Sequence, residues 1–387
     1  MTGVWAYPWA LEAGGLSSEL ESIAALGVRE VNVATAYHSI RTTLPRGEDG
    51  LFDSYRGGLF FDPGESIERA AIELPRARAP WTSDALGDVV SAADEHDLAV
   101  NAWTVCNHGS RLGELNPEYR AESAFGDALD HALCPSHPAV RTAMGAVVES
   151  AADYGVDRID LESIGFPSAF HGHGANWGHG KDHVITTPLQ KLLVSQCFCD
   201  ACRSEARSVG FDVAAARELV RELVRDSLGG PRAGPDGSVE SLRRAEPLLA
   251  DLFEFRTHVI ETLLGKLAAA SGDRELNYYV ADGLGRDVSD VAPAGVDLTR
   301  FDAHLDSVTS ICYTDDPAVA RERSEALVET FDGTVHAGVS LNPEYVSSRE
   351  ELGSLLAPVR ETIDGTVSIY NHSLCGPEQL DWIGSVA

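Results

Sequence analysis

Apolar, β-branched runs alternate with helical patterns along the whole chain, and this order limits the fold more than any other feature. Most of the runs are continuously apolar, as expected for parallel strands that are buried on both faces. Helical patterns lie between them, for example at 17–27, 83–97, 138–155, 317–333 and 348–365. The eight strand candidates begin at Gly3, Val28, Leu98, Val156, Glu275, Leu305, Thr334 and Thr366.

Eight strand–helix units in succession predict a (β/α)8 TIM barrel, an α/β fold that forms a single domain over residues 1–387. A doubly wound open sheet is the competing arrangement, but no glycine-rich phosphate loop follows the first strand. Two segments exceed the minimal unit, at 39–81 and 165–272. We expect the second to be a long helical insertion or lid after strand four, because loops of this length are usually functional.

The chain is strongly acidic, with 60 Asp and Glu residues against 30 Lys and Arg residues and a net charge of −30. Acidic residues spread along the whole chain keep a surface hydrated in concentrated salt, which indicates a halophilic protein. Nucleic acid and anionic lipid are disfavoured as partners, because both require a basic patch. The sequence contains no long apolar run and no signal-like segment, so we expect a cytoplasmic protein without a membrane span. A homo-oligomer is compatible with a barrel of this size.

In such a barrel the active site lies at the carboxyl ends of the strands. Aromatic side chains there can stack on sugar rings, while amides, histidines and carboxylates can bind hydroxyls. The sequence therefore predicts a small-molecule carbohydrate as ligand and no organic cofactor, although the aromatic residues could instead simply fill the barrel mouth. The predicted binding residues at the strand ends are Trp9, Tyr37, His38, Trp103, His108, Arg111, Tyr279, Tyr313, Asn371 and His372.

The fourth strand candidate, VDRIDLESI from Val156, is the sharpest chemical feature. Strand alternation places Asp160 and Glu162 on one face, where two neighbouring carboxylates raise each other's pKa. Such a pair suits acid–base or nucleophilic chemistry on a glycosidic bond. The alternative is a structural ion pair, with Arg158 or Arg111 as partner. Glu162 is the first candidate, and a second carboxylate from across the barrel would be Asp282, Asp315 or Glu344.

Three cysteines crowd into the segment CFCDAC, at Cys197, Cys199 and Cys202. Crowded thiols in a cytoplasmic chain favour a metal over a disulfide, and a tetrahedral zinc needs four such ligands. The fourth ligand could be Cys134, Cys106 or a loop histidine. The alternative is a set of reduced thiols packed on a helix face.

The motifs VDRIDLES (from Val156), ALCPSHPAVR (from Ala132) and CFCDACRSEA (from Cys197) resemble segments of glycoside-hydrolase-like barrels. The resemblance covers roughly residues 98–206. In this region the chain is distantly similar to family-42 β-galactosidases. Two departures are visible: Arg158 replaces a glycine common in the fourth strand, and Leu161–Glu162 stands where family-42 enzymes have Asn-Glu. The resemblance implies a glycosidase with Glu162 as a catalytic carboxylate. It also implies a structural zinc held by the three clustered cysteines and a fourth cysteine upstream of them.

Two other functions remain open. One is a metal-dependent sugar isomerase or epimerase, in which Glu162, Asp282 and histidines such as His372 hold a divalent cation. The other is a non-catalytic carbohydrate-binding barrel.

The segment FHGHGANWGHGKDH, from Phe170 to His183, follows the fourth strand. We interpret it as a substrate-facing lid, with Trp177 as a stacking platform and His171 and His173 as hydroxyl partners. A solvated histidine-rich loop is an equally good reading of this composition, and one of its histidines could also complete the zinc site.

Overall fold

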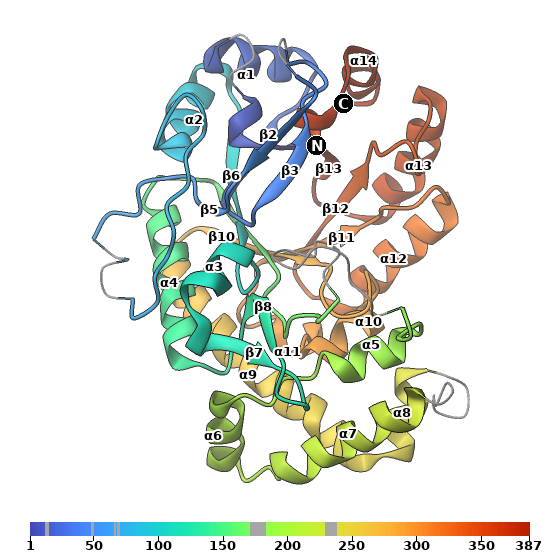
Figure 1. Ribbon diagram of the computed structural model, residues 1–387. Coiled ribbons are helices and arrows are strands. Elements are labelled where there is room, and N and C mark those ends of the chain that lie inside the picture. Colours follow the sequence, from blue (N-terminus) through green and yellow to red (C-terminus); the bar gives the residue numbers. More distant parts are fainter. Residues whose placement is uncertain (12–14, 48–49, 66, 68–69, 171–182, 229–237) are drawn as a thin grey trace.

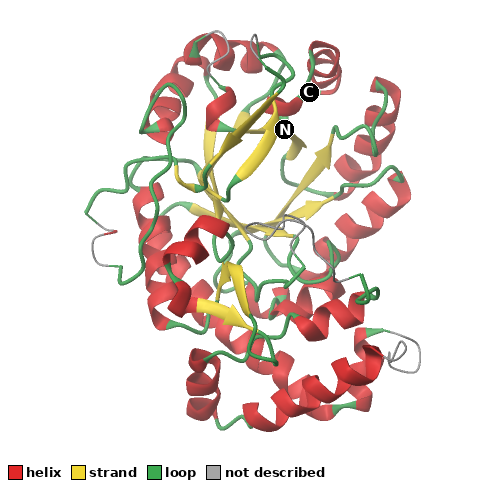
Figure 2. Cartoon of the chain, viewed as in Figure 1, coloured by secondary structure: helices red, strands yellow, loops and turns green. Residues whose placement is uncertain are grey.

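The eight predicted strands form a closed parallel barrel in the computed structural model (Figures 1 and 2). The structure describes residues 1–387 except 12–14, 48–49, 66, 68–69, 171–182 and 229–237. β1 pairs in parallel with both β2 and β13, and these two pairings close the ring. The barrel strands are β1 (Thr2–Ala6), β2 (Glu30–Tyr37), β6 (Ala99–Val105), β9 (Arg158–Glu162), β10 (Glu275–Val280), β11 (Ser307–Ile311), β12 (Thr334–Ser340) and β13 (Val367–Tyr370).

Helices surround this barrel, as expected for (β/α)8 topology, so the predicted fold class is confirmed. The helices that follow the barrel strands are α1 (Leu16–Ala25), α2 (Ala85–Ala93), α4 (Pro138–Ala152), α9 (Pro247–Ser271), α11 (Leu298–Phe301), α12 (Pro317–Thr330), α13 (Arg349–Thr362) and α14 (Pro377–Val386). None of the described helices is both long enough and apolar enough to cross a membrane.

Additional elements occupy the long connections. A hairpin of β3 (Ile40–Thr43) and β4 (Phe52–Tyr55) follows β2, and β5 (Gly58–Leu59) adds to β2 in antiparallel fashion. After β6 come α3 (Ser110–Leu115), β7 (Arg120–Glu122) and β8 (Ala128–Leu133). The 165–272 segment contributes α5 (Pro188–Val194), α6 (Asp200–Val209), α7 (Val213–Leu228) and α8 (Val239–Ala245) before α9. Figure 1 shows α6, α7 and α8 gathered at one end of the molecule. The short α10 (Val288–Val291) follows β10.

The side chains on the outer face of the barrel strands are apolar, whereas those that point into the barrel are both polar and aromatic. Outward side chains such as Val31, Ile159 and Val308 are fully buried under the helices. The deep interior is a polar layer, in which Arg158 contacts Asp160 at 2.7 Å and Glu30 at 3.4 Å. Buried ions require such partners, because an unpaired charge would be strongly destabilising.

Aromatic residues lie above the polar layer, toward the carboxyl ends of the strands. Trp5 donates a hydrogen bond to the Tyr279 hydroxyl (2.8 Å), which in turn donates to Asp160 (2.7 Å). Trp5 fits here because Gly338 in β12 lacks a side chain: a Cβ at this position would lie 2.4 Å from the Trp5 ring. This aromatic layer forms the floor of the barrel mouth.

Candidate functional site

A cavity of about 890 Å³ opens at the barrel mouth. Its walls come from the carboxyl-terminal parts of five strands or the residues that follow them, through Tyr37, Trp103, Glu162, Tyr313 and Tyr370. A volume of this size suits a small-molecule ligand. The remaining lining residues are Trp5, His38, Ser39, Ile40, Arg41, Ser54, Tyr55, Arg56, Ser110, Arg111, Glu114, Tyr279, Ala281, Arg286 and Ile311.

Glu162 is the carboxylate at the end of β9. Its Oε2 accepts a hydrogen bond of 2.6 Å from the indole Nε1 of Trp103. Burial raises the pKa of Glu162 to about 7, the Trp103 hydrogen bond lowers it, and the charge of Asp282 raises it. A carboxyl group with this pKa exchanges its proton near neutrality, which is the property required of a general acid–base catalyst.

Asp282 follows β10. In the barrel, β10 and β6, the strand of Trp103, lie on opposite sides of β9, the strand of Glu162. Asp282 accepts hydrogen bonds from the Gly165 backbone N–H (3.1 Å) and the Tyr278 hydroxyl (2.9 Å). Burial raises the pKa of Asp282, while these donors lower it. Asp282 is not among the cavity-lining residues. It therefore acts on Glu162 through its charge.

Asp160 does not share the environment of Glu162, although strand alternation puts both on one face. Its side chain is fully buried in the polar layer, bonded to Arg158, Asn277 (2.8 Å) and Tyr279. The geometry therefore gives Asp160 a structural role, which was the alternative expected for this strand. The proposed catalytic pair of Asp160 and Glu162 is not formed.

The other two predicted carboxylates lie away from the cavity wall. Asp315 follows β11 and is exposed, and Glu344 follows β12 and is also exposed. Glu344 contacts only its neighbour Asn342 in the described hydrogen bonds, at 3.4 Å and through its own backbone N–H. Neither carboxylate is among the residues that line the cavity.

Several predicted binding residues come together in the cavity. Tyr37 and Trp103 meet edge to face with ring centroids 4.7 Å apart. Burial raises the pKa of the tyrosines that surround them, so their hydroxyls are neutral donors and acceptors. The predicted residues that line the wall are Tyr37, His38, Trp103, Arg111, Tyr279 and Tyr313.

Four predicted binding residues do not line this cavity. Trp9 is stacked between Tyr7 and Tyr55, with centroid distances of 4.6 Å to each. His108 borders a smaller neighbouring cavity of about 30 Å³. Asn371 is buried and accepts a hydrogen bond from the Ser373 backbone N–H (2.8 Å).

His372, the fourth of these, is buried with its imidazole against Arg46 and Glu19. Burial and, to a smaller extent, the charge of Arg46 lower its pKa to about 3, so the ring is neutral. The ligand set expected for a sugar isomerase, Glu162 with Asp282 and His372, is not assembled around one point of the cavity wall. His171, His173 and Trp177 lie outside the described residues.

The hairpin β3–β4 and the loop after β10 supply wall residues that sequence reasoning did not select. These are Arg41, Tyr55 and Arg56 from the hairpin region, Glu114 from α3 and Arg286 from the loop. Their signal in the sequence is weak, because they come from irregular segments between strands.

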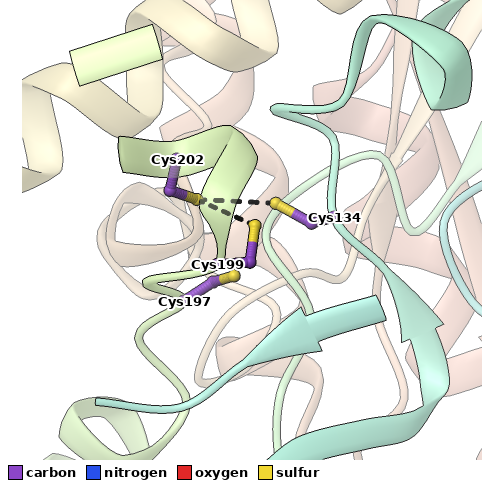
Figure 3. A group of neighbouring side chains, drawn as sticks. All are labelled: Cys134, Cys197, Cys199 and Cys202. Atoms are coloured by element: carbon purple, nitrogen blue, oxygen red, sulfur yellow. Dashed lines mark hydrogen bonds between the residues drawn. The ribbon is translucent and has the colours of Figure 1, made fainter. Parts of the chain in front are cut away.

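The four cysteines Cys134, Cys197, Cys199 and Cys202 form a buried cluster (Figure 3). Their sulfur atoms all lie within 4.8 Å of one another, with 3.5 Å between Cys134 and Cys202 and 3.8 Å between Cys199 and Cys202. Tetrahedral zinc with bonds of about 2.3 Å separates its sulfurs by roughly 3.8 Å, so the cluster fits such an ion. Cys134, one of three fourth ligands considered, is the one that completes the group, while Cys106 lies elsewhere in the core.

Arg256 in α9 lies directly beside this cluster and is fully buried. Its guanidinium donates to the Cys202 sulfur (3.2 Å) and to the carbonyl of Cys197, and it stacks 4.2 Å from the centre of the Phe166 ring. The Glu122 backbone N–H also points at Cys197 Sγ (3.2 Å). Four thiolates around a divalent cation would have a net charge of −2, and these donors stabilise that charge.

No family model matches this chain, and no curated protein sequence matches it. Solved structures do. The β-galactosidase from the psychrophilic Marinomonas ef1 matches with a TM-score of 0.54 and 12% identity, over 100% of this chain and 58% of that one. The α-L-fucosidase isoenzyme 2 from Paenibacillus thiaminolyticus matches with a TM-score of 0.51 and 12% identity, over 95% and 44% of the two chains.

The predicted resemblance to glycoside hydrolase barrels is confirmed at the level of the fold. This chain spans little more than half of the β-galactosidase and less than half of the fucosidase. At 12% identity the similarity establishes architecture alone.

Proposed function

We propose that this protein is a glycoside hydrolase-like enzyme that cleaves a glycosidic bond at the barrel mouth, with Glu162 as the acid–base residue. One observation supports this role above all: Glu162 lines an aromatic cavity and has a pKa of about 7. A protonated carboxyl group can deliver its proton to the leaving glycosidic oxygen, and its carboxylate can then accept a proton from water.

The aromatic residues of the cavity wall indicate the class of substrate. Tyr37, Trp103 and Tyr313 present ring faces and edges around Glu162. Sugar rings have apolar faces that pack on such rings, and the neutral tyrosine hydroxyls can bond sugar hydroxyls. These features support a small glycoside as substrate.

Glycosidases use a second carboxylate, as nucleophile or as general base. Asp282 is our candidate, because its charge acts on Glu162 and both side chains are half-buried. Glu114, the other carboxylate on the cavity wall, is engaged by Arg56 at 3.2 Å.

The test is turnover of aryl glycosides by the wild-type protein, Glu162→Gln and Asp282→Asn, at high salt. Loss of a general acid lowers kcat/KM by about 10²–10⁴-fold for poor leaving groups. The loss should be much smaller for dinitrophenyl leaving groups, which need no proton. Glu361→Gln on α13, an exposed glutamate paired with Arg321, is the matched control and should retain full activity.

Cleavage that is equally fast in Glu162→Gln for every leaving group would contradict the proposal. A protein that binds sugars but hydrolyses none, with Glu162→Gln binding as well as the wild type, would favour the non-catalytic carbohydrate-binding barrel instead. Activity that depends on an added divalent cation would favour the isomerase class.

A further inference from the structure

The cavity wall has the opposite charge balance to the rest of the chain. Acidic residues outnumber basic ones by 60 to 30 in the whole sequence. On the wall the order is reversed, with Arg41, Arg56, Arg111 and Arg286 against two glutamates, Glu114 and Glu162. Glu162 contributes less negative charge than an ordinary glutamate, because its pKa is about 7. The mouth is therefore a cationic site in an acidic protein.

Two of the four arginines, Arg56 and Arg111, already bind partners within the protein. Arg56 forms an ion pair with Glu114, and both side chains are largely exposed. Arg111 donates to the backbone carbonyls of Gly57 (3.0 Å) and Arg76 (2.9 Å), which fixes the loop after β4. Burial and the nearby charge of Arg56 lower the pKa of Arg111, so positive charge is crowded on this wall.

Arg286 and Arg41 are different, because no ion pair between described residues involves either of them. Arg286 lies in the loop after β10, with its guanidinium 4.9 Å from the centre of the Tyr313 ring and one bond to the Tyr313 carbonyl (3.3 Å). Arg41 stacks 4.5 Å from the centre of the Phe52 ring on the β3–β4 hairpin. Aromatic contacts hold both guanidinium groups in place and leave N–H donors for a ligand.

Arg286 and Glu162 line the same cavity as Tyr313. Burial contributes most to the raised pKa of Tyr313, Tyr370 and Glu162 raise it further, and Arg286 lowers it. Arg286 and Glu162 thus have opposite effects on the pKa of Tyr313. An anionic group bound at Arg286 would therefore occupy the same cavity as a bond cleaved at Glu162.

We propose that the cavity binds an acidic sugar, a glycoside of a uronic acid, whose carboxylate pairs with Arg286 while Arg41 attracts it from the hairpin. The planar guanidinium matches a carboxylate in a two-bond arrangement, which a neutral hydroxymethyl group cannot reproduce. A local cationic mouth is also what an anionic ligand needs in order to approach a chain with a net charge of −30. This inference rests on the proposed function only for the statement that the sugar is cleaved.

The experiment measures binding without turnover, by calorimetric titration at fixed ionic strength. The probes are D-glucuronate and D-galacturonate against D-glucose and D-galactose, with galactose 6-sulfate and galactose 6-phosphate as the other anions. We expect a uronate to bind at least about tenfold more tightly than its neutral sugar, as for a hydrogen bond to a charged group. Arg286→Gln should abolish the preference, Arg286→Lys should restore part of it, and Arg321→Gln on α12 should leave it unchanged.

Equal affinity for uronates and neutral sugars would overturn the inference, and so would a uronate preference that survives in Arg286→Gln. Tighter binding of the 6-sulfate or 6-phosphate than of both uronates would overturn the assignment to a carboxylate. Turnover of aryl glycosides and aryl uronides separates this inference from the proposed function. Cleavage of neutral glycosides alone would overturn the acidic-sugar inference, while the proposed hydrolase activity would stand. Arg286-dependent uronate binding without any cleavage would overturn the hydrolase activity, while the acidic-sugar inference would stand.

Discussion

Glu162 combines two conditions that are rarely met together in one residue: it borders an open cavity, and its carboxyl group is poorly solvated. Burial and the charge of Asp282 both favour the protonated form, while Trp103 favours the ionised form through its hydrogen bond. The residue can therefore hold or release a proton close to neutral pH.

The first prediction is a pH limit on activity. If the protonated form of Glu162 is required, kcat/KM should fall as the pH rises through about 7. Trp103→Phe removes the donor that stabilises the carboxylate, so the pKa should rise and the limit should move to higher pH. Rates measured from pH 5 to 9 with wild type and variant check this. A limit that moves to lower pH would refute the role given to Trp103.

The second prediction concerns stability. The folded protein binds the Glu162 proton more tightly than the unfolded chain does, because burial raises the pKa from 4.5 to about 7. Glu162 therefore costs no stability well below pH 4.5, its cost grows as the pH rises from about 4.5 to about 7, and the cost is constant at higher pH. At pH 8, Glu162→Gln should raise the free energy of unfolding by up to roughly 3 kcal/mol, since one pKa unit equals about 1.4 kcal/mol.

Denaturant unfolding at pH 4.5 and pH 8 measures this difference. Glu361→Gln, on the exposed face of α13, serves as the control and should change little at either pH. A gain in Glu162→Gln that is the same at both pH values would mean that the carboxyl is solvated in the folded protein.

At the residue scale, alternation along one strand correctly grouped Asp160 with Glu162 on the inner face. Strand alternation could not predict that Asp160 and Glu162 have different surroundings, because these depend on how deep each side chain lies in the barrel. Glu162 borders the cavity, whereas Asp160, two residues earlier in the strand, contacts Arg158, Asn277 and Tyr279. Two of these partners belong to β10, more than a hundred residues further along the chain.

Among the elements, the eight barrel strands were predictable because each is a buried run with a local apolar signature. The hairpins β3–β4 and β7–β8 were not predicted. β4 is short and mostly exposed, so its sequence has no apolar alternation to detect. Since the β3–β4 hairpin supplies part of the cavity wall, much of the wall was missed with it.

The cysteine cluster joins elements that are distant in sequence, since Cys134 follows β8 and the other three residues surround the start of α6. The third prediction is one zinc per chain, bound by all four thiolates. Cys134→Ser and Cys202→Ser should lose the metal and melt at lower temperature, because a bound structural ion stabilises only the folded state. Metal analysis and thermal unfolding with and without a chelator measure both effects.

Cys312→Ser provides the matched control for a lost buried thiol. Cys312 is fully buried, but it contacts Ser310 (3.3 Å) and Ser324 (3.5 Å) rather than the cluster. Its variant should retain zinc. Metal-free wild-type protein with an unchanged melting temperature would show that the cluster is a set of packed thiols.

The whole molecule has two populations of charge that should respond differently to salt. The net charge of −30 is spread along the chain, so mutual repulsion destabilises the folded state in dilute buffer. The Arg158–Asp160–Glu30 network, in contrast, is buried and out of reach of dissolved ions. Composition alone predicted the first population, and only the assembled barrel reveals the second.

The fourth prediction follows from this difference. The melting temperature of the wild type should rise steadily as KCl increases from about 0.1 M to 2 M, because the Debye length falls from about 10 Å to below 3 Å. Asp160→Asn should lower the melting temperature by a similar amount at every salt concentration, since its partners are shielded from solvent. A melting temperature that is insensitive to KCl would argue against the halophilic interpretation, and a defect in Asp160→Asn that fades with salt would place the network in contact with solvent.

The hydrogen bond from the Trp103 indole to Glu162 has a spectroscopic consequence. An indole N–H proton bonded to a carboxylate resonates at lower field than one bonded to a neutral acid. In a sample labelled with ¹⁵N at its tryptophans, the Trp103 cross-peak should therefore shift along with the protonation of Glu162. The resonance can be assigned through Trp103→Phe. The Trp103 indole resonance thus reports the protonation state of Glu162 directly, without a substrate.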